Sequence, residues 1–124
     1  MAFGWIGVDL DATLAHYDGW VGADSPIGKP IPKMLERVKR WLDKGKTVKI
    51  FTARVDGDTD GKQEKMIKEW CKEHIGQELE VTNVKTRSMW ELWDDRAVGV
   101  QKNTGNVSIE RWDKDEKRRS LRFP

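Results

Sequence analysis

Apolar residues gather in short runs along the chain, separated by polar segments, and these runs predict strands. FGWIGV at 3–8 is continuously apolar, as is typical of a strand buried on both faces of a sheet. Three more strands are predicted by similar runs: TVKIF at 47–51, LEVTNV at 79–84 and a short strand within WELWDDRAVGV at 90–100. VGV at 98–100 and NVSIE at 106–110 predict a terminal hairpin around the turn from Asn103 to Asn106.

Two segments between these runs show the spacing of an amphipathic helix. In the first, apolar residues fall at i, i+1, i+4, i+7 and i+8, namely at Met34, Leu35, Val38, Trp41 and Leu42. Pro30 and Pro32 precede this helix and Gly45 follows it, which are start and stop signals. The second helix carries Met66, Ile67, Trp70, Cys71 and Ile75 on one face and ends before Gly76.

Strands that alternate with helices predict an α/β fold. Because short right-handed crossovers join parallel strands, we expect a three-layer sandwich with a central, mostly parallel sheet. In such sheets, ligands bind at the carboxyl ends of the strands. The edge at which these strands end is therefore where functional residues are expected.

Composition narrows the function classes only slightly. The 124 residues suit one domain spanning 1–124, and 23 basic against 21 acidic residues give a net charge of +2. A charge so close to balance does not call for a nucleic acid or an anionic membrane as partner. The sequence has no apolar run long enough to span a bilayer, no secretory signal pattern at its start, and a single cysteine, Cys71. We therefore expect a cytoplasmic protein with no membrane partner.

Polar side chains follow each predicted strand at its carboxyl end. They are Asp9, Asp11 and Thr13 after the first strand, Thr52 and Arg54 after the second, Lys85 after the third, and Asp94 and Asp95 after the fourth. If the first strand continues in extended form, Asp9 and Asp11 share a side, about 6.6 Å apart at about 3.3 Å per residue. Acidic, hydroxyl and cationic groups together are the mixture that holds a divalent cation and a phosphoryl group.

These residues resemble the motifs of the haloacid dehalogenase-like (HAD) superfamily. DLDAT at 9–13 resembles the first motif, DxDxT, and KIFT, which ends at Thr52, resembles the second. Lys85 resembles the lysine of the third motif, and WDD, with Asp94 and Asp95, resembles the acidic fourth. The resemblance covers about residues 5–100 and keeps the motif order, each motif at the end of a predicted strand.

The resemblance implies phosphatase chemistry on the two aspartates of the first motif. Asp9 would attack phosphorus and form an aspartyl-phosphate, which splits hydrolysis into two easier steps. Asp11 would protonate the leaving oxygen and later deprotonate the attacking water. An anionic Asp9 that approaches a phosphate is opposed by about 4 kcal/mol per pair of unit charges at about 4 Å, so a cation must offset that repulsion.

The resemblance also implies a Mg²⁺ site and a set of phosphate-binding residues. The implied metal ligands are the Asp9 carboxylate, the Asp11 backbone carbonyl and Asp94, with Asp95 acting through water or orienting Lys85. The predicted phosphate-binding residues are Thr13, Thr52, Arg54 and Lys85, of which Thr52 would donate to the phosphoryl oxygens and Lys85 would neutralise them.

Two assignments stay open at the level of sequence. Lys85 lies only nine residues before Asp94, so Lys62, at the start of the second predicted helix, competes for the role of motif-three lysine. Arg54 completes Thr-Ala-Arg, which resembles the Ser/Thr-Gly-Arg run of polynucleotide phosphatases in the superfamily, but it is equally well interpreted as a surface arginine.

The polar, Gly-rich segment 15–29, here named the flap, carries His16, Tyr17 and Trp20 at the position where the resembling family has a flap over the active site. These side chains would either stack on a substrate or pack down onto the domain. Only about 38 residues separate Thr13 from Thr52, which leaves no room for a cap domain. We therefore expect an open site that admits nucleotides or polynucleotide ends.

A Mg²⁺-dependent phosphohydrolase is the function that the residues and the resemblance favour. The alternative is a phosphate-binding or regulatory module that keeps the fold without turnover. Neither the oligomeric state nor the identity of the phosphorylated substrate follows from the sequence.

Overall fold

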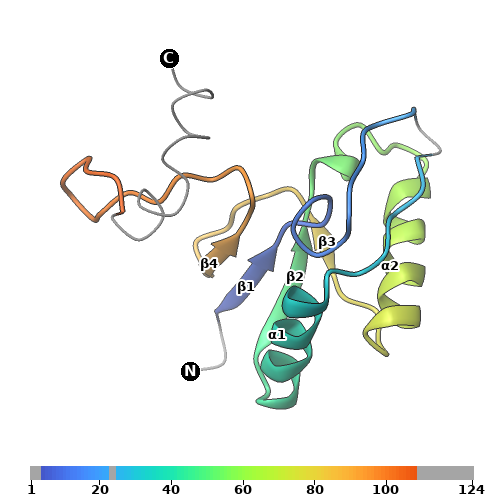
Figure 1. Ribbon diagram of the computed structural model, residues 1–124, viewed down its shortest axis with the longest axis horizontal. Coiled ribbons are helices and arrows are strands. Elements are labelled where there is room, and N and C mark those ends of the chain that lie inside the picture. Colours follow the sequence, from blue (N-terminus) through green and yellow to red (C-terminus); the bar gives the residue numbers. More distant parts are fainter. Residues whose placement is uncertain (1–3, 23–24, 109–124) are drawn as a thin grey trace.

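Four strands form one parallel sheet at the centre of the structure, a computed structural model that describes residues 4–22 and 25–108 (Figure 1). The strands are β1 (Trp5–Val8), β2 (Thr47–Phe51), β3 (Val81–Thr82) and β4 (Met89–Trp93). They lie in the order β3-β2-β1-β4, and every neighbouring pair is parallel. The chain adds strands in one direction from β1 to β3 and then crosses to the other side of β1, which creates a topological switch point between β1 and β4.

Two α-helices and a short 3₁₀ helix connect these strands: α1 (Pro32–Asp43), η1 (Ala53–Val55) and α2 (Lys62–His74). Pro32 begins α1 because its fixed φ suits the first helical position, and Gly45, with φ of 79°, follows the end of the helix. The α2 N-terminus is capped by Asp58, whose carboxylate oxygens accept from the backbone N–H groups of Gln63 and Glu64. Both helices confirm the spacing seen in the sequence.

The core lies between the two α-helices and one face of the sheet. β1 and β2 pair Ile6 with Val48 and Val8 with Ile50, so these four buried side chains point to the same face. They share one apolar cluster with side chains of both helices, namely Met34, Val38, Ile67, Trp70 and Cys71. Packing these amphipathic faces against one sheet face is what holds β1 and β2, and the residues that follow them, in place.

The opposite face of β1 is buried by the connection from β3 to β4, which crosses the sheet (Figure 1). The Trp5 side chain lies there, donating from Nε1 to Thr86 Oγ1 at 2.9 Å, with Lys49 Nζ 4.6 Å from the centre of its ring. β1 is thus buried on both faces, as its apolar run predicts. The fold is α/β with a central parallel sheet and is consistent with a Rossmann-like three-layer sandwich. Among the described residues, the layers are the two α-helices on one face, the sheet, and the connection from β3 to β4 on the other face.

Two elements differ in length from their prediction. The third strand was predicted over 79–84 but pairs only at Val81 and Thr82, because it is an edge strand whose chain turns away where Thr82 Oγ1 accepts from Val84 N at 3.0 Å. The terminal hairpin is confirmed as a bridge between Val100 and Val107. Its turn includes Asn103 and Gly105, both with positive φ. Residues 109–110 of the predicted hairpin lie outside the described residues, and so do residues 1–3.

The segment between Thr13 and Thr52 contains the flap, α1 and β2 as far as the structure describes it, and no cap domain. Among the described residues, none of the helices is sufficiently long and apolar to cross a membrane.

Candidate functional site

Three carboxylates meet at the switch point between β1 and β4. Val8 pairs with Trp93, so the residues that follow the two strands become neighbours, and Asp9 N donates to Trp93 O at 2.9 Å. Asp9, Asp94 and Asp95 each place an oxygen so that these atoms all lie within 4.8 Å of one another. We name these three residues the carboxylate group. It brings together three of the four predicted metal-binding aspartates, and only the carboxylate of Asp11 lies outside it.

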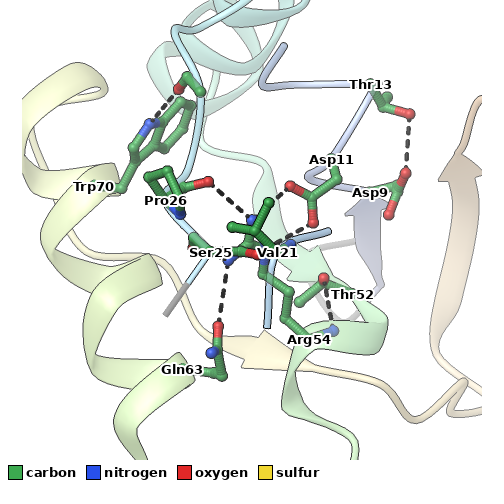
Figure 2. Close-up of polar contacts among 11 residues, drawn as sticks. Asp9, Asp11, Thr13, Val21, Ser25, Pro26, Thr52, Arg54, Gln63 and Trp70 are labelled. Carbon is green, nitrogen blue, oxygen red and sulfur yellow. Dashed lines mark hydrogen bonds and ion pairs between the residues drawn. The ribbon is translucent and has the colours of Figure 1, made fainter. Parts of the chain in front are cut away.

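Thr13 joins two members of the carboxylate group. Its Oγ1 lies 3.1 Å from Asp9 Oδ2 (Figure 2). It also lies 3.3 Å from Asp95 Oδ1, so its single proton is shared between two acceptors. The same oxygen accepts from Asp95 N at 3.0 Å. Thr13 is buried and therefore positions the two carboxylates. We predicted that Thr13 binds phosphate, but in this arrangement its hydroxyl contacts Asp9 and Asp95.

The turn that carries Asp9 and Asp11 is tight. Ala12 has a φ of 71°, the left-handed region that costs an alanine roughly 1 kcal/mol and a glycine nothing. The turn is closed by backbone bonds from Leu14 and Ala15 N to Leu10 O, at 2.9 and 2.8 Å. These bonds hold the two aspartates on the same edge of the sheet.

Burial and negative neighbours change the protonation of Asp9. Burial raises the pKa of its carboxyl from the ordinary value of 3.8 to about 7, with repulsion from Asp94 and a hydrogen bond to Asp95 adding to the rise. The hydrogen bond from Thr13 acts in the opposite direction but is smaller. The site thus resists a full negative charge on Asp9 unless a cation enters.

We predict that this carboxyl makes the cation-free protein less stable as the pH rises. Below about pH 4, Asp9 is neutral in the folded and unfolded states. Between about pH 4 and 7 the unfolded chain ionises it while the fold opposes ionisation, so the free energy of unfolding falls. Asp9→Asn, which stays neutral, should melt at a progressively higher temperature than wild type from pH 5 to pH 8 in EDTA. A melting-temperature difference that does not change with pH would contradict this prediction.

Asp11 points to a different partner, Arg54 (Figure 2). Arg54 donates from Nε to Asp11 Oδ2 at 2.7 Å and from Nη2 to Asp11 Oδ1 at 2.9 Å, a bidentate pair. The guanidinium also donates to the backbone carbonyls of Ser25 and Pro26 in the flap, at 2.8 and 3.2 Å, and to Gln63 Oε1 of α2 at 3.4 Å. Arg54 therefore connects the first turn, the flap and α2.

This arrangement decides between the two interpretations of Arg54. Its side chain is 2% exposed, so it is not a surface arginine. An arginine has five N–H groups, and the five bonds above use all of them, which leaves none for a phosphoryl oxygen. The predicted phosphate-binding role does not fit this arrangement, because the buried protein acceptors already satisfy the guanidinium.

A cavity of about 420 Å³ opens beside these residues, which is within the range of small-molecule sites. Asp9, Asp11, Thr52 and Asp95 line it. Thr52 is buried, and its Oγ1 accepts from Arg54 N at 3.1 Å. Since that bond uses a lone pair of Thr52 Oγ1, the hydroxyl proton can be donated into the cavity.

The predicted lysines do not line this cavity. Lys85 is exposed on the connection after β3, and Lys62 is exposed in the first turn of α2. Arg96 lines the cavity instead, placed there by a turn in which its backbone N donates to Asp94 Oδ1 at 2.8 Å. Arg96 was not predicted from the sequence as a site residue. Its position two residues after Asp94, a predicted strand-end aspartate, could have indicated it.

Comparison with protein-family models and with curated proteins finds no match for this chain. Among solved structures, the chain is similar to a conserved protein encoded by a locus of Bacteroides thetaiotaomicron, with a TM-score of 0.55 and 21% sequence identity over 97% of both chains. At this identity the likeness concerns the fold alone. It supports the α/β architecture over nearly the whole length of the chain.

Proposed function

We propose that this protein is a Mg²⁺-dependent phosphohydrolase of the HAD type, which acts through an aspartyl-phosphate on Asp9. The observation that carries the proposal is the carboxylate group at the ends of β1 and β4, whose oxygens lie within 4.8 Å of one another. Two of its members, Asp9 and Asp95, line a cavity that Asp11 also lines. Acidic clusters are common on protein surfaces, but here Asp11, the buried Thr52 and Arg96 line the same cavity as Asp9 and Asp95.

The donor set fits magnesium. Carboxylate oxygens are the ligands that Mg²⁺ takes in proteins. Burial, and then repulsion from Asp94, raise the pKa of Asp9, and a divalent cation would offset both by stabilising its ionised carboxylate. Asp9, Asp94 and Asp95 are the residues that would hold it. When bound, Mg²⁺ supplies positive charge that offsets the repulsion between Asp9 and a phosphate.

The residues of the chain divide the remaining chemistry between them. An Asp9 oxygen forms a bond to phosphorus while the bond from phosphorus to the leaving oxygen breaks, and Asp11 gives that oxygen a proton. Water then attacks the phosphorus, Asp11 takes a proton from it, and Asp9 is released. Arg54 fixes the plane of the Asp11 carboxylate through one lone pair on each oxygen, and the second lone pair of either oxygen can carry the transferred proton.

Release of phosphate from 4-nitrophenyl phosphate tests the proposal. We expect phosphate release with Mg²⁺ and its loss in EDTA. We also expect a nucleotide or an end-phosphorylated oligonucleotide to release phosphate faster than phosphosugars do. No Mg²⁺-dependent release from any of these substrates would contradict the proposal. A non-catalytic phosphate-binding module is the alternative, favoured by the position of Lys85 outside the cavity.

Asp94 should be needed for metal binding and not for folding. Asp94→Ala removes one of three carboxylates from the group, so we expect Mg²⁺ affinity, measured by calorimetry, to fall about tenfold or more. The control is Asp56→Ala, which removes an acid that lines the cavity beside Asp9 and Asp95 but lies outside the carboxylate group. Equal affinity in the Asp94 variant and wild type would remove Asp94 from the ligand set.

The cation that neutralises the phosphoryl group can be assigned by a pair of substitutions. If Lys85 has this role, as the resemblance implies, Lys85→Ala should lower kcat about a hundredfold to a thousandfold. The position of Lys85 outside the cavity instead favours Arg96, which lines it, so we expect that loss in Arg96→Ala and near wild-type kcat in Lys85→Ala. The reverse result would show that the connection after β3 moves over the site when substrate binds.

The cytoplasmic location stays a prediction from the lone cysteine, Cys71, which is buried. A polynucleotide as substrate is likewise a proposal, supported by the open edge of the sheet.

A further inference from the structure

Two aromatic side chains of the flap line the same cavity as the catalytic aspartates. Tyr17 is 41% exposed and Trp20 is 49% exposed, and both contribute to the cavity wall. Tryptophan is highly buried on average in folded proteins, because its large apolar ring is driven out of water. These two aromatic residues instead keep about half of their surface exposed while lining the cavity.

Trp20 is held in place from beneath. The guanidinium carbon of Arg54 lies 4.8 Å from the centre of its ring, a cation–π contact with an arginine that is itself almost fully buried. Since Arg54 occupies one face of the indole, the exposed half of Trp20 consists of the other face and the ring edges. Val21 and Ser25 of the flap are also anchored, because Val21 N donates to the buried Ser25 Oγ and Ser25 O accepts from Arg54.

We infer that Trp20, with Tyr17 beside the same cavity, is a stacking site for a planar ring on the leaving group of the substrate, as in a nucleoside monophosphate. This inference rests on the proposed function, because it assumes that the phosphate lies near Asp9. A cavity of about 420 Å³ is far larger than a phosphoryl group, so most of it is open to the rest of the substrate. An immobilised indole with a free face binds a nucleobase at little cost in conformational freedom.

Binding without turnover tests the inference. The probes are AMP and ribose 5-phosphate, which carry the same phosphate on a ribose and differ in the base, and they are titrated into full-length Asp9→Asn with Mg²⁺ by calorimetry. Stacking of one base corresponds to about a fivefold to hundredfold gain in affinity, so AMP should bind at least fivefold more tightly. Trp20→Ala in the same background should remove the preference, and Trp20→Phe should retain most of it.

Trp90→Ala is the matched control. Trp90 is 56% exposed like Trp20, but it packs against Gly4 at the opposite end of β1, away from the cavity. Trp90→Ala should therefore leave the preference for AMP unchanged. Melting temperatures of all variants show whether the flap stays folded, and Trp20→Phe keeps the test valid if Trp20→Ala unfolds.

Each outcome has a distinct meaning. Equal affinity for the two probes, or a preference for AMP that survives Trp20→Ala, overturns the stacking site. Because Asp9→Asn removes one of the three carboxylates that would hold Mg²⁺, absence of binding by both probes is checked in wild type, and absence there as well overturns the stacking site together with the phosphate site. A preference for AMP that depends on Trp20, in a wild-type protein that releases no phosphate, upholds the stacking site and contradicts only the hydrolytic function.

Discussion

Asp9→Asn should reduce Mg²⁺-dependent phosphate release by on the order of 10⁴-fold or more. An amide oxygen is a poor nucleophile for phosphorus, and the substitution also removes one carboxylate from the group that would hold the cation. The loss should appear in kcat, because the cavity walls that bind the rest of the substrate are unchanged.

The size of this loss must be separated from misfolding and from contaminating phosphatases. Circular dichroism and melting at pH 5 should show Asp9→Asn to be folded, and Asp56→Asn, the same change on the same cavity wall, should retain near wild-type kcat. A variant at Asp9 with unchanged activity would show that another group attacks phosphorus or that the observed activity belongs to a contaminant.

Arg54→Ala should be the most destabilising substitution at the site, lowering the free energy of unfolding by about 3–5 kcal/mol. It removes the partner of the Asp11 carboxylate and the N–H groups that Arg54 donates to two flap carbonyls and to Gln63 Oε1. The loss is a large part of the roughly 5–15 kcal/mol that folds a domain. Arg54→Lys should recover only part of it, because an ammonium keeps the charge but not the planar arrangement of five donors.

Urea unfolding at pH 7 measures this effect. Arg40→Ala is the control, since Arg40 forms a surface pair with Glu36 and is 54% exposed, and such pairs contribute about 0–1 kcal/mol. If Arg54→Ala and Arg40→Ala unfold at the same urea concentration, then the connections made by Arg54 do not hold the flap to the domain.

The helices and strands could be predicted from the sequence wherever the burial of apolar side chains sets their spacing along the chain. The spacing of apolar residues in α1 and α2 and the continuous run of β1 specify element type and buried face, because burial of those side chains drives folding. The length of β3 could not be predicted, since an edge strand ends where its single neighbour ends and where Thr82 captures the next N–H.

The candidate site was predictable to the extent that it depends on strand ends. Asp9, Asp94 and Asp95 come together because their strands pair, which follows from the alternation of elements. The partners of Arg54 and the position of Arg96 depend instead on how loops fold over the edge of the sheet. Loop geometry of this kind leaves no period in the sequence, so the roles of these arginines were not foreseen.

The anchor of the flap has a consequence for how this protein can diversify. Arg54 holds the flap through the main-chain oxygens of Ser25 and Pro26, which every amino acid possesses. Side chains at positions such as Tyr17 and Trp20 can therefore be exchanged while the attachment of the loop persists. Directed evolution of ligand preference should accordingly proceed through these two positions, with Asp9, Asp11 and Arg54 left intact.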